Sequence, residues 1–167
     1  LGSRGAAVFE DYSGTAAGRG LLLLSVEAVE HHMSRAMQAG YQVNTHAIGD
    51  LANDRVLDFY DRLVKRYGAE AQRHRIEHAQ IFRPQDIQRV AAGGYIASIQ
   101  PTHATSDMNM AGDRLGDARL TGAYAWKKLL DSGARMAGGS DFPVESPNPF
   151  YGLYAAVTRR DHEGRPL

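Results

Sequence analysis

The chain contains no cysteine among its 167 residues, and its 19 basic and 19 acidic side chains leave a formal net charge of zero. Without cysteine there is no disulfide framework, no Cys-bound zinc or iron–sulfur cluster, and no thiol nucleophile. A metal ion in this protein must therefore be held by His, Asp or Glu side chains.

The sequence also lacks dense runs of one charge and long apolar segments. No cluster of Lys and Arg reaches the density of a surface that follows a phosphate backbone, so we expect no nucleic acid partner. The longest aliphatic run, residues 21–24, is far shorter than the roughly 20 residues that a membrane-spanning helix needs. We expect no membrane partner and a cytoplasmic location, and a signal peptide upstream of Leu1 would not be visible.

Apolar periodicity and capping residues predict helices and strands in strict alternation. Ser25 is a typical N-cap for a first helix that ends at Gly40, and Asn148 followed by Pro149 opens the last helix. The predicted helices are 26–39, 51–67, 84–92, 121–132 and 149–159, the predicted strands are 41–45, 74–77, 95–99 and 135–137, and a polar loop is expected over 102–120. Helical crossovers require parallel strands, which is the α/β class. A doubly wound sheet and a (β/α)8 barrel both satisfy this order.

Each predicted strand ends in a residue that can bind a metal or a substrate. In chain order these residues are His46, His78, Gln100 with His103, and Asp141. Because the carboxyl ends of parallel strands form the ligand face of α/β proteins, we expect these side chains to converge. Two imidazoles and a carboxylate suit Zn²⁺, Mn²⁺ or Fe²⁺, with an open position for a water. The alternative is that each His is a hydrogen-bonded packing residue, and the convergence of several favours a site.

Other chemistries have weaker support. There is no Gly-x-Ser-x-Gly motif around Ser140, no phosphate-binding loop and no dinucleotide glycine motif. His74 precedes His78 by four residues, which on a strand is about 13 Å, too far for one metal. Asp50 suits a helix N-cap at least as well as a functional acid.

The strand 74–77 leaves one question open. Alternation puts Arg75 and Glu77 on the face opposite His78, where a barrel strand would meet its helices. Either the two charges neutralise each other as a pair, or the strand is irregular at its end.

Four ordered motifs in this chain resemble the later strand motifs of the amidohydrolase superfamily. They are Thr-His-Ala-Ile-Gly-Asp at 45–50, Arg-Ile-Glu-His-Ala-Gln at 75–80, Ser-Ile-Gln-Pro-Thr-His at 98–103 and Gly-Ser-Asp-Phe-Pro-Val-Glu at 139–145. The similarity is to the long metal-dependent branch that includes N-substituted formamide deformylase and exoenzyme-regulatory proteins. It implies a partial (β/α)8 TIM barrel, about strands 5 to 8 with their helices.

The resemblance also implies roles for the candidate residues. His46, His78 and Asp141 match metal ligands after strands 5, 6 and 8, for one or two divalent ions that we expect to be zinc. Asp141 would also exchange protons with a metal-activated water that attacks an amide-type carbon–nitrogen bond of a small molecule. Gln100 and His103 would contact that substrate.

Two elements of the family pattern are missing from the chain, namely the His-x-His motif of strand 1 and the lysine of strand 4. Residues 1–24 resemble the loop after strand 4, and residues 25–160 resemble strand–helix units 5 to 8. We therefore expect residues 1–167 to be a fragment of the barrel domain that hydrolyses little alone. Exposed barrel edges would favour a homo-oligomer.

Two other functions remain open at this point. The chain could be a catalytically silent α/β module for binding or regulation, which would be indifferent to Asp141→Ala. It could also be a metal-independent enzyme with His103 as general base, which would be insensitive to chelators.

Overall fold

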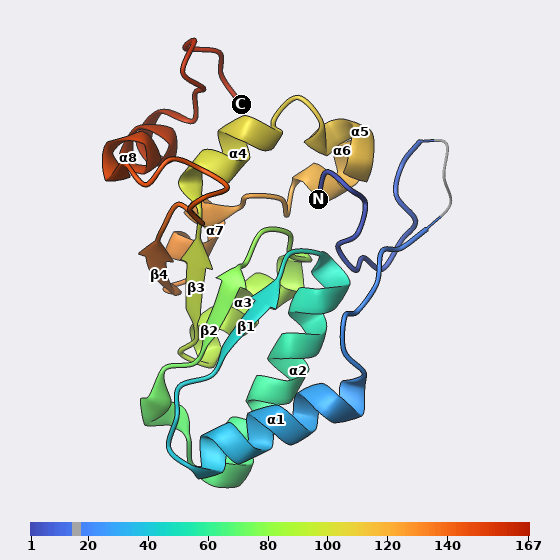
Figure 1. The fold of residues 1–167 in the computed structure, drawn as a ribbon, viewed down its shortest axis with the longest axis vertical. Coiled ribbons are helices and arrows are strands. Elements are labelled where there is room, and N and C mark those ends of the chain that lie inside the picture. Colours follow the sequence, from blue (N-terminus) through green and yellow to red (C-terminus); the bar gives the residue numbers. More distant parts are fainter. Residues whose placement is uncertain (15–17) are drawn as a thin grey trace.

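Parallel strands and helices alternate along the chain in the computed structural model (Figure 1), which describes residues 1–14 and 18–167. Residues 15–17 of the expected loop 1–24 lie outside the described residues. The strands form one sheet in the order β1 (Asn44–Ala47), β2 (Arg75–His78), β3 (Ile96–Ile99) and β4 (Arg135–Gly138). Every neighbouring pair is parallel. The predicted α/β class is confirmed, and the arrangement is compatible with part of a (β/α)8 barrel.

The long helices follow the capping signals of the sequence. They are α1 (Val26–Gln38), α2 (Asp50–Tyr67), α3 (Pro84–Ala92) and α8 (Pro149–Thr158), and a short 3₁₀ helix, η1 (Glu70–Gln72), follows α2. Ser25 Oγ accepts a hydrogen bond from the Ala28 N–H at 3.2 Å, and Gly68 ends α2 in the left-handed conformation. Among the described residues, no helix combines the length and apolar character that crossing a membrane requires.

The prediction of a polar loop over 102–120 is wrong, because this region is mostly helical. It contains α4 (Pro101–Asp107), α5 (Ala111–Leu115) and α6 (Asp117–Leu120). Pro101 opens α4 as its first residue, and Gly116 separates α5 from α6 with a φ of +72°. Helices this short are stable only through tertiary packing, so their local sequence reads as a loop.

The predicted helix at 121–132 is shorter than expected, since α7 spans only Trp126–Asp131. Ala123 forms an antiparallel bridge with Ile81, and Tyr124 has a φ of +48°. A β-bridge at Ala123 and a positive φ at Tyr124 are both incompatible with an α-helix. The strand expected at 41–45 is also shifted, since β1 begins at Asn44 and contains His46.

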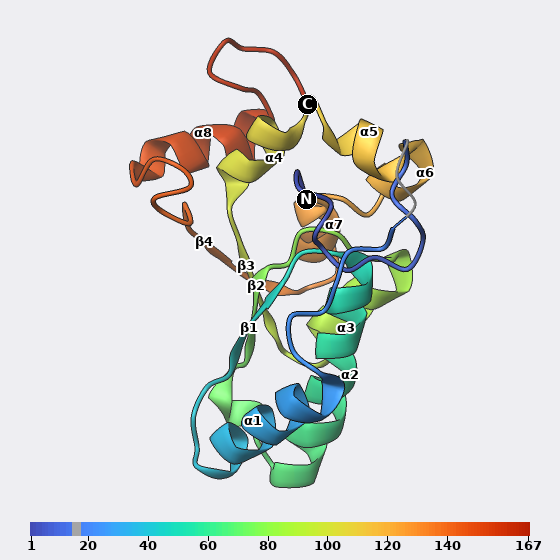
Figure 2. The ribbon, with the colours of Figure 1, turned by 45° about the vertical axis from the view of Figure 1, so that its right-hand side comes forward.

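Helices α2 and α3 cover one face of the sheet (Figure 2). The Tyr60 hydroxyl of α2 lies 2.8 Å from Thr45 Oγ1 and donates to the Arg75 carbonyl oxygen at 2.7 Å. Thr45 is paired in register with Ile76, which is fully buried. Thr45 and Ile76 therefore face the helices, and their strand neighbours face the other way.

Arg75 and Glu77 lie on the opposite, open face of the sheet. Arg75 Nε is 2.8 Å from Glu77 Oε1, and Arg75 Nη2 donates to Glu77 Oε2 at 3.0 Å. His46 is paired in register with Glu77 and so shares this face. The two charges neutralise each other, and β2 is irregular at its end because His78 has a φ of +76°. Both explanations that the sequence left open hold, and the two side chains do not meet the helix layer.

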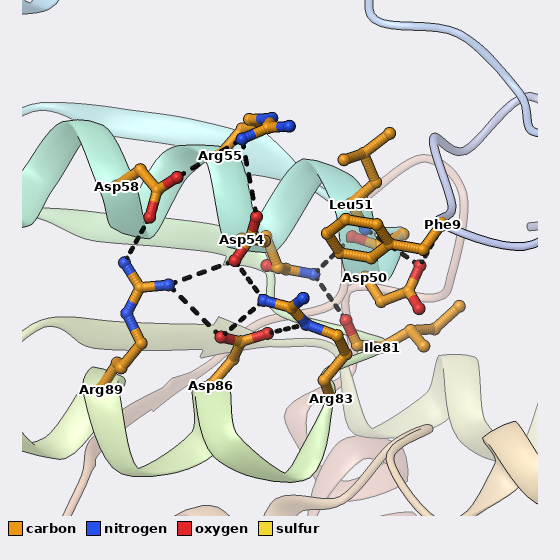
Figure 3. Close-up of polar contacts among 12 residues, drawn as sticks. Phe9, Asp50, Leu51, Asp54, Arg55, Asp58, Ile81, Arg83, Asp86 and Arg89 are labelled. Carbon is orange, nitrogen blue, oxygen red and sulfur yellow. Dashed lines mark hydrogen bonds and ion pairs between the residues drawn. The ribbon is translucent and has the colours of Figure 1, made fainter.

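A cluster of ion pairs joins α2 to α3 (Figure 3). The buried Asp86 accepts from Arg83 Nε at 2.7 Å and from Arg89 Nη1 at 3.3 Å. Asp54 of α2 pairs with both arginines, and Arg89 also reaches Asp58 at 2.8 Å. Since removing any one partner leaves a charge unpaired, the cluster favours one spacing of the two helices and of the strands that precede them.

His74, just before β2, gives the fold a predicted dependence on pH. It is buried, and its Nδ1 accepts from the Val43 N–H at 3.0 Å. Burial lowers the pKa of His74 below its usual value of about 6.5. The unfolded chain therefore binds this proton more readily, so the free energy of unfolding should fall as the pH falls below about 6.5. Urea unfolding at about pH 7.5 and about pH 5.5 measures this loss.

The control for this prediction is His74→Asn, whose side-chain oxygen can still accept from the Val43 N–H but does not titrate. We expect a smaller loss of stability in acid for this variant than for the wild type. An equal loss in the two proteins would contradict the prediction.

Candidate metal centre

Three potential metal ligands come from three different strand ends. His78 is the last residue of β2, His103 lies in the first turn of α4 after β3, and Asp141 follows β4. One nitrogen or oxygen atom from each residue lies within 4.8 Å of those of the other two. The sheet thus brings together side chains that are far apart in the sequence.

His46 lies beside this cluster without joining it. Its ring centroid is 4.4 Å from that of His78, with the two planes at 72°. The His78 and His103 rings are nearly parallel, with centroids 5.9 Å apart. Gln100, the N-cap residue of α4, is buried, and its side chain raises the pKa of His78. All five residues expected at the strand ends therefore gather at this edge of the sheet. The tight group, His78, His103 and Asp141, contains His103 and not His46.

The backbone is unusual at two of the three ligand positions. His78 has a φ of +76°, the following Ala79 has +47°, and Asp141 has +57°. For residues other than glycine this conformation costs about 1–2 kcal/mol each, and such positions cluster at functional sites. At His78 it breaks the alternation of β2, so that the ring meets His46 on the open face.

Burial and neighbouring groups set the charge of His78. Burial lowers the pKa of His78, and the adjacent His46 and His103 lower it further, against the opposing effects of Asp141 and Gln100. The neutral imidazole is the form that binds a metal. At neutral pH His78 is therefore ready to act as a ligand.

Two nitrogen atoms in the cluster have no partner. His78 Nδ1 and His103 Nε2 are buried and, within residues 1–14 and 18–167, accept or donate no hydrogen bond. Leaving such a group unsatisfied costs about 1–3 kcal/mol. Imidazole nitrogens and a carboxylate are the donor set of Zn²⁺, Mn²⁺ and Fe²⁺ sites. The residues present fit a divalent metal ion.

A buried network behind the cluster went undetected in the sequence. Gln80 Nε2 donates to Asp107 Oδ2 at 2.9 Å and to the Tyr124 hydroxyl at 2.6 Å, and that hydroxyl donates to Asp107. Gln80 follows His78 by two residues, and Asp107 ends α4. The network fixes α4 against the loop that follows His78. Gln80 belongs to the motif at 75–80, but nothing in the sequence pairs it with the other two residues.

Asn53 is a second residue that sequence reasoning missed. It is fully buried in α2, and its Nδ2 donates to the carbonyl oxygens of Ile48 (3.1 Å), Gly49 (3.0 Å) and Ile81 (2.9 Å). These oxygens belong to the loops after β1 and β2, so Asn53 ties together the segments that follow His46 and His78. Gly49 is required here because a Cβ atom would lie 1.9 Å from the Ala7 carbonyl oxygen. Asp50, by contrast, accepts from the Phe9 N–H at 3.1 Å and is structural (Figure 3).

Comparison with known proteins gives consistent matches over nearly the whole chain. A model of the amidohydrolase family matches residues 1–166. Protein LONG AFTER FAR-RED 3 of Arabidopsis thaliana is 37% identical over 160 residues, which are 95% of this chain and 27% of the relative. N-substituted formamide deformylase of Arthrobacter pascens is 30% identical over 137 residues, which are 80% of this chain and 24% of the relative.

A solved structure has the same fold. The crystal structure of an uncharacterized metal-dependent hydrolase from Pyrococcus horikoshii OT3 matches with a TM-score of 0.86 at 30% sequence identity, covering 99% of this chain and 32% of that chain. The chain thus spans 24–32% of the length of these proteins.

Proposed function

Because the chain belongs to the amidohydrolase family, we propose that it forms part of a metal-dependent hydrolase that cleaves amide-type carbon–nitrogen bonds in small molecules. The observation that carries this proposal is the cluster of His78, His103 and Asp141, whose ligand atoms lie within 4.8 Å of one another. The balanced charge of the chain supports a small-molecule substrate over a nucleic acid.

The proposed roles follow the positions of the side chains. His46, His78 and Asp141 hold one or two divalent ions, zinc in our proposal, and Gln100 and His103 border the space where the substrate binds. When bound, the ion supplies an activated water and polarises the carbonyl oxygen of the substrate.

Asp141 moves the protons of the reaction. Its carboxylate is partly exposed, with Oδ2 4.0 Å from His103 Nε2, so it reaches both the ligand cluster and the solvent. It accepts a proton from the attacking water and donates it to the leaving nitrogen. His78 remains unprotonated because burial lowers its pKa.

We further propose that residues 1–167 form part of a barrel domain, with 1–24 as the loop after strand 4 and 25–160 as strand–helix units 5 to 8. Support comes from the sheet order, in which β1 and β4 each have one strand neighbour within the described residues.

The test of the function is metal binding and hydrolysis by the purified, metal-free chain. We expect weak zinc binding, with a Kd of about 1 µM or higher, and slow hydrolysis of N-substituted formamides that stops with a chelator and returns with Zn²⁺. Calorimetry and a product assay measure the two quantities. Tight stoichiometric zinc with rapid turnover would contradict the proposal that the site is incomplete. Chelator-insensitive hydrolysis would favour His103 as a metal-free base, and absence of metal binding would favour a silent module.

Apolar surfaces beyond the two edges of the sheet predict self-association of the isolated chain. Beside β1, a groove of about 540 Å³ is lined largely by apolar side chains, including residues 21–24. At the other side, α8 exposes Phe150, Leu153 and Val157. We expect dimers or larger species in sedimentation velocity that increase with concentration.

Leu23→Asp and Val157→Asp should each shift the chain toward the monomer, because each places a charge on one of these apolar surfaces. Ala118→Asp is the control, since Ala118 is exposed on α6 and neither lines the groove nor belongs to α8. A monomeric wild type at all concentrations would contradict the prediction.

A further inference from the structure

We infer that His103 is itself a metal ligand, coordinating one ion together with His78 and Asp141. The inference rests on the proposed function only in that it requires a divalent metal at this site. It assigns His103 a closer role than contact with the substrate, and it concerns binding by the chain in the absence of any substrate.

The distances favour coordination by these three residues. His103 Nε2 lies 4.0 Å from Asp141 Oδ2, and all three ligand atoms lie within 4.8 Å of one another. Ligands at about 2.0–2.1 Å from a tetrahedral zinc ion are about 3.4 Å apart. The three atoms therefore need to approach one another by no more than about 1.4 Å to bind one ion.

The hydrogen bonding of His103 also favours a ligand. Its Nε2 is buried without a partner in the part of the chain that the structure describes, and Asp141 at 4.0 Å is too far for a hydrogen bond. Among the same described residues, His74 Nε2 is unpartnered as well and belongs to no ligand cluster, but the Nδ1 of that ring accepts from the Val43 N–H. An unsatisfied nitrogen within 4.8 Å of two other potential ligands is what a metal would satisfy.

Helix α4, which carries His103, is tied to the loop that follows His78 and to the loop that carries Asp141. At the end of the helix, Asp107 accepts from Gln80 Nε2 at 2.9 Å, two residues after His78. One residue earlier, Ser106 Oγ donates to Glu145 Oε1 at 2.7 Å, on the loop that carries Asp141. Because α4 is fixed to both loops, the imidazole is positioned before any ion binds.

In this assignment His46 is not a ligand of the ion that His78, His103 and Asp141 bind. Its ring contacts that of His78 but its nitrogens are outside the tight group, and the residue is exposed. Replacement of His46 should therefore weaken binding of this ion less than replacement of His103.

The experiment is titration of the untagged chain with Co²⁺ and Zn²⁺ near neutral pH, followed by calorimetry and by the visible absorption of Co²⁺. His103→Ala should raise the Kd at least tenfold, by analogy with the about 10–100-fold losses caused by weaker, outer contacts, and should alter the Co²⁺ spectrum. His46→Ala should have a smaller effect. The matched control is His32→Ala, an exposed histidine on α1, which should leave both readouts unchanged.

Nitrogen NMR of labelled histidine in the wild type gives a readout that does not depend on a variant folding. Zn²⁺ should shift the His103 Nε2 resonance. If it does not, or if folded His103→Ala and His103→Gln bind Co²⁺ with the wild-type Kd and spectrum, the inference is wrong. In that outcome His78→Ala and Asp141→Ala still weaken binding if the proposed metal-dependent function holds. If these two variants also have no effect, that function fails as well.

Discussion

Asp141→Asn should reduce zinc-dependent hydrolysis by about 10²–10⁴-fold, the range expected for loss of a group that transfers protons in the transition state. The amide has nearly the shape of the carboxylate, but it cannot accept a proton from the attacking water, and it is a weaker metal ligand. Because we expect the chain alone to hydrolyse slowly, the rate is best measured under single-turnover conditions with excess zinc-loaded protein.

A matched variant separates this role from a general effect of lost charge. Asp131→Asn makes the same chemical change at an exposed residue of α7 that pairs with Lys127, and we expect it to keep the wild-type rate. If Asp141→Asn retained more than half of the activity, Asp141 would not transfer the proton. A silent binding module would show no zinc-dependent rate in any of the three proteins.

Asn53→Asp should destabilise the fold by about 3–5 kcal/mol, as expected for an unpaired buried charge. The asparagine amide donates to three carbonyl oxygens in a fully buried position. An ionised carboxylate in its place cannot donate, and it would face the negative ends of three carbonyl dipoles. Urea unfolding near neutral pH measures the loss.

The destabilisation caused by Asn53→Asp should itself depend on pH. The introduced carboxyl should have a higher pKa in the folded chain than its unfolded value of about 3.9. The penalty is then complete above the folded-state pKa and shrinks as the pH falls below it, because the protonated form can donate. The free-energy difference from the wild type should therefore decrease toward about pH 4.

Asn148→Asp is the control for this prediction. Asn148 is exposed, and its Oδ1 accepts from the Phe150 N–H at 3.1 Å as the N-cap of α8. Aspartate caps helices as well as asparagine does, so this variant should change the stability by no more than about 0.5 kcal/mol. Equal effects of the two substitutions would show that the hydrogen bonds of Asn53 do not carry the expected stability.

The candidate site was predictable from the sequence to the extent that it depends on strand ends. His46, His78, Gln100, His103 and Asp141 were identified because parallel strands place their carboxyl ends together, and the structure gathers them at one edge. Which of them form the group whose ligand atoms lie within 4.8 Å of one another was not predictable. That depends on the positive φ at His78 and Asp141 and on the docking of α4.

The sequence by itself determined the α/β class, the long helices and their ends, because capping by Ser25, Asn148 and Gly68 and the apolar period act over a few neighbouring residues. Only the tertiary structure decided that 102–120 forms short helices, which need packing to be stable. The tertiary structure also decided that Arg75 and Glu77 lie on the open face of the sheet, and that His103 forms a group with His78 and Asp141. These features depend on contacts between distant segments, and local propensity carries no information about such contacts.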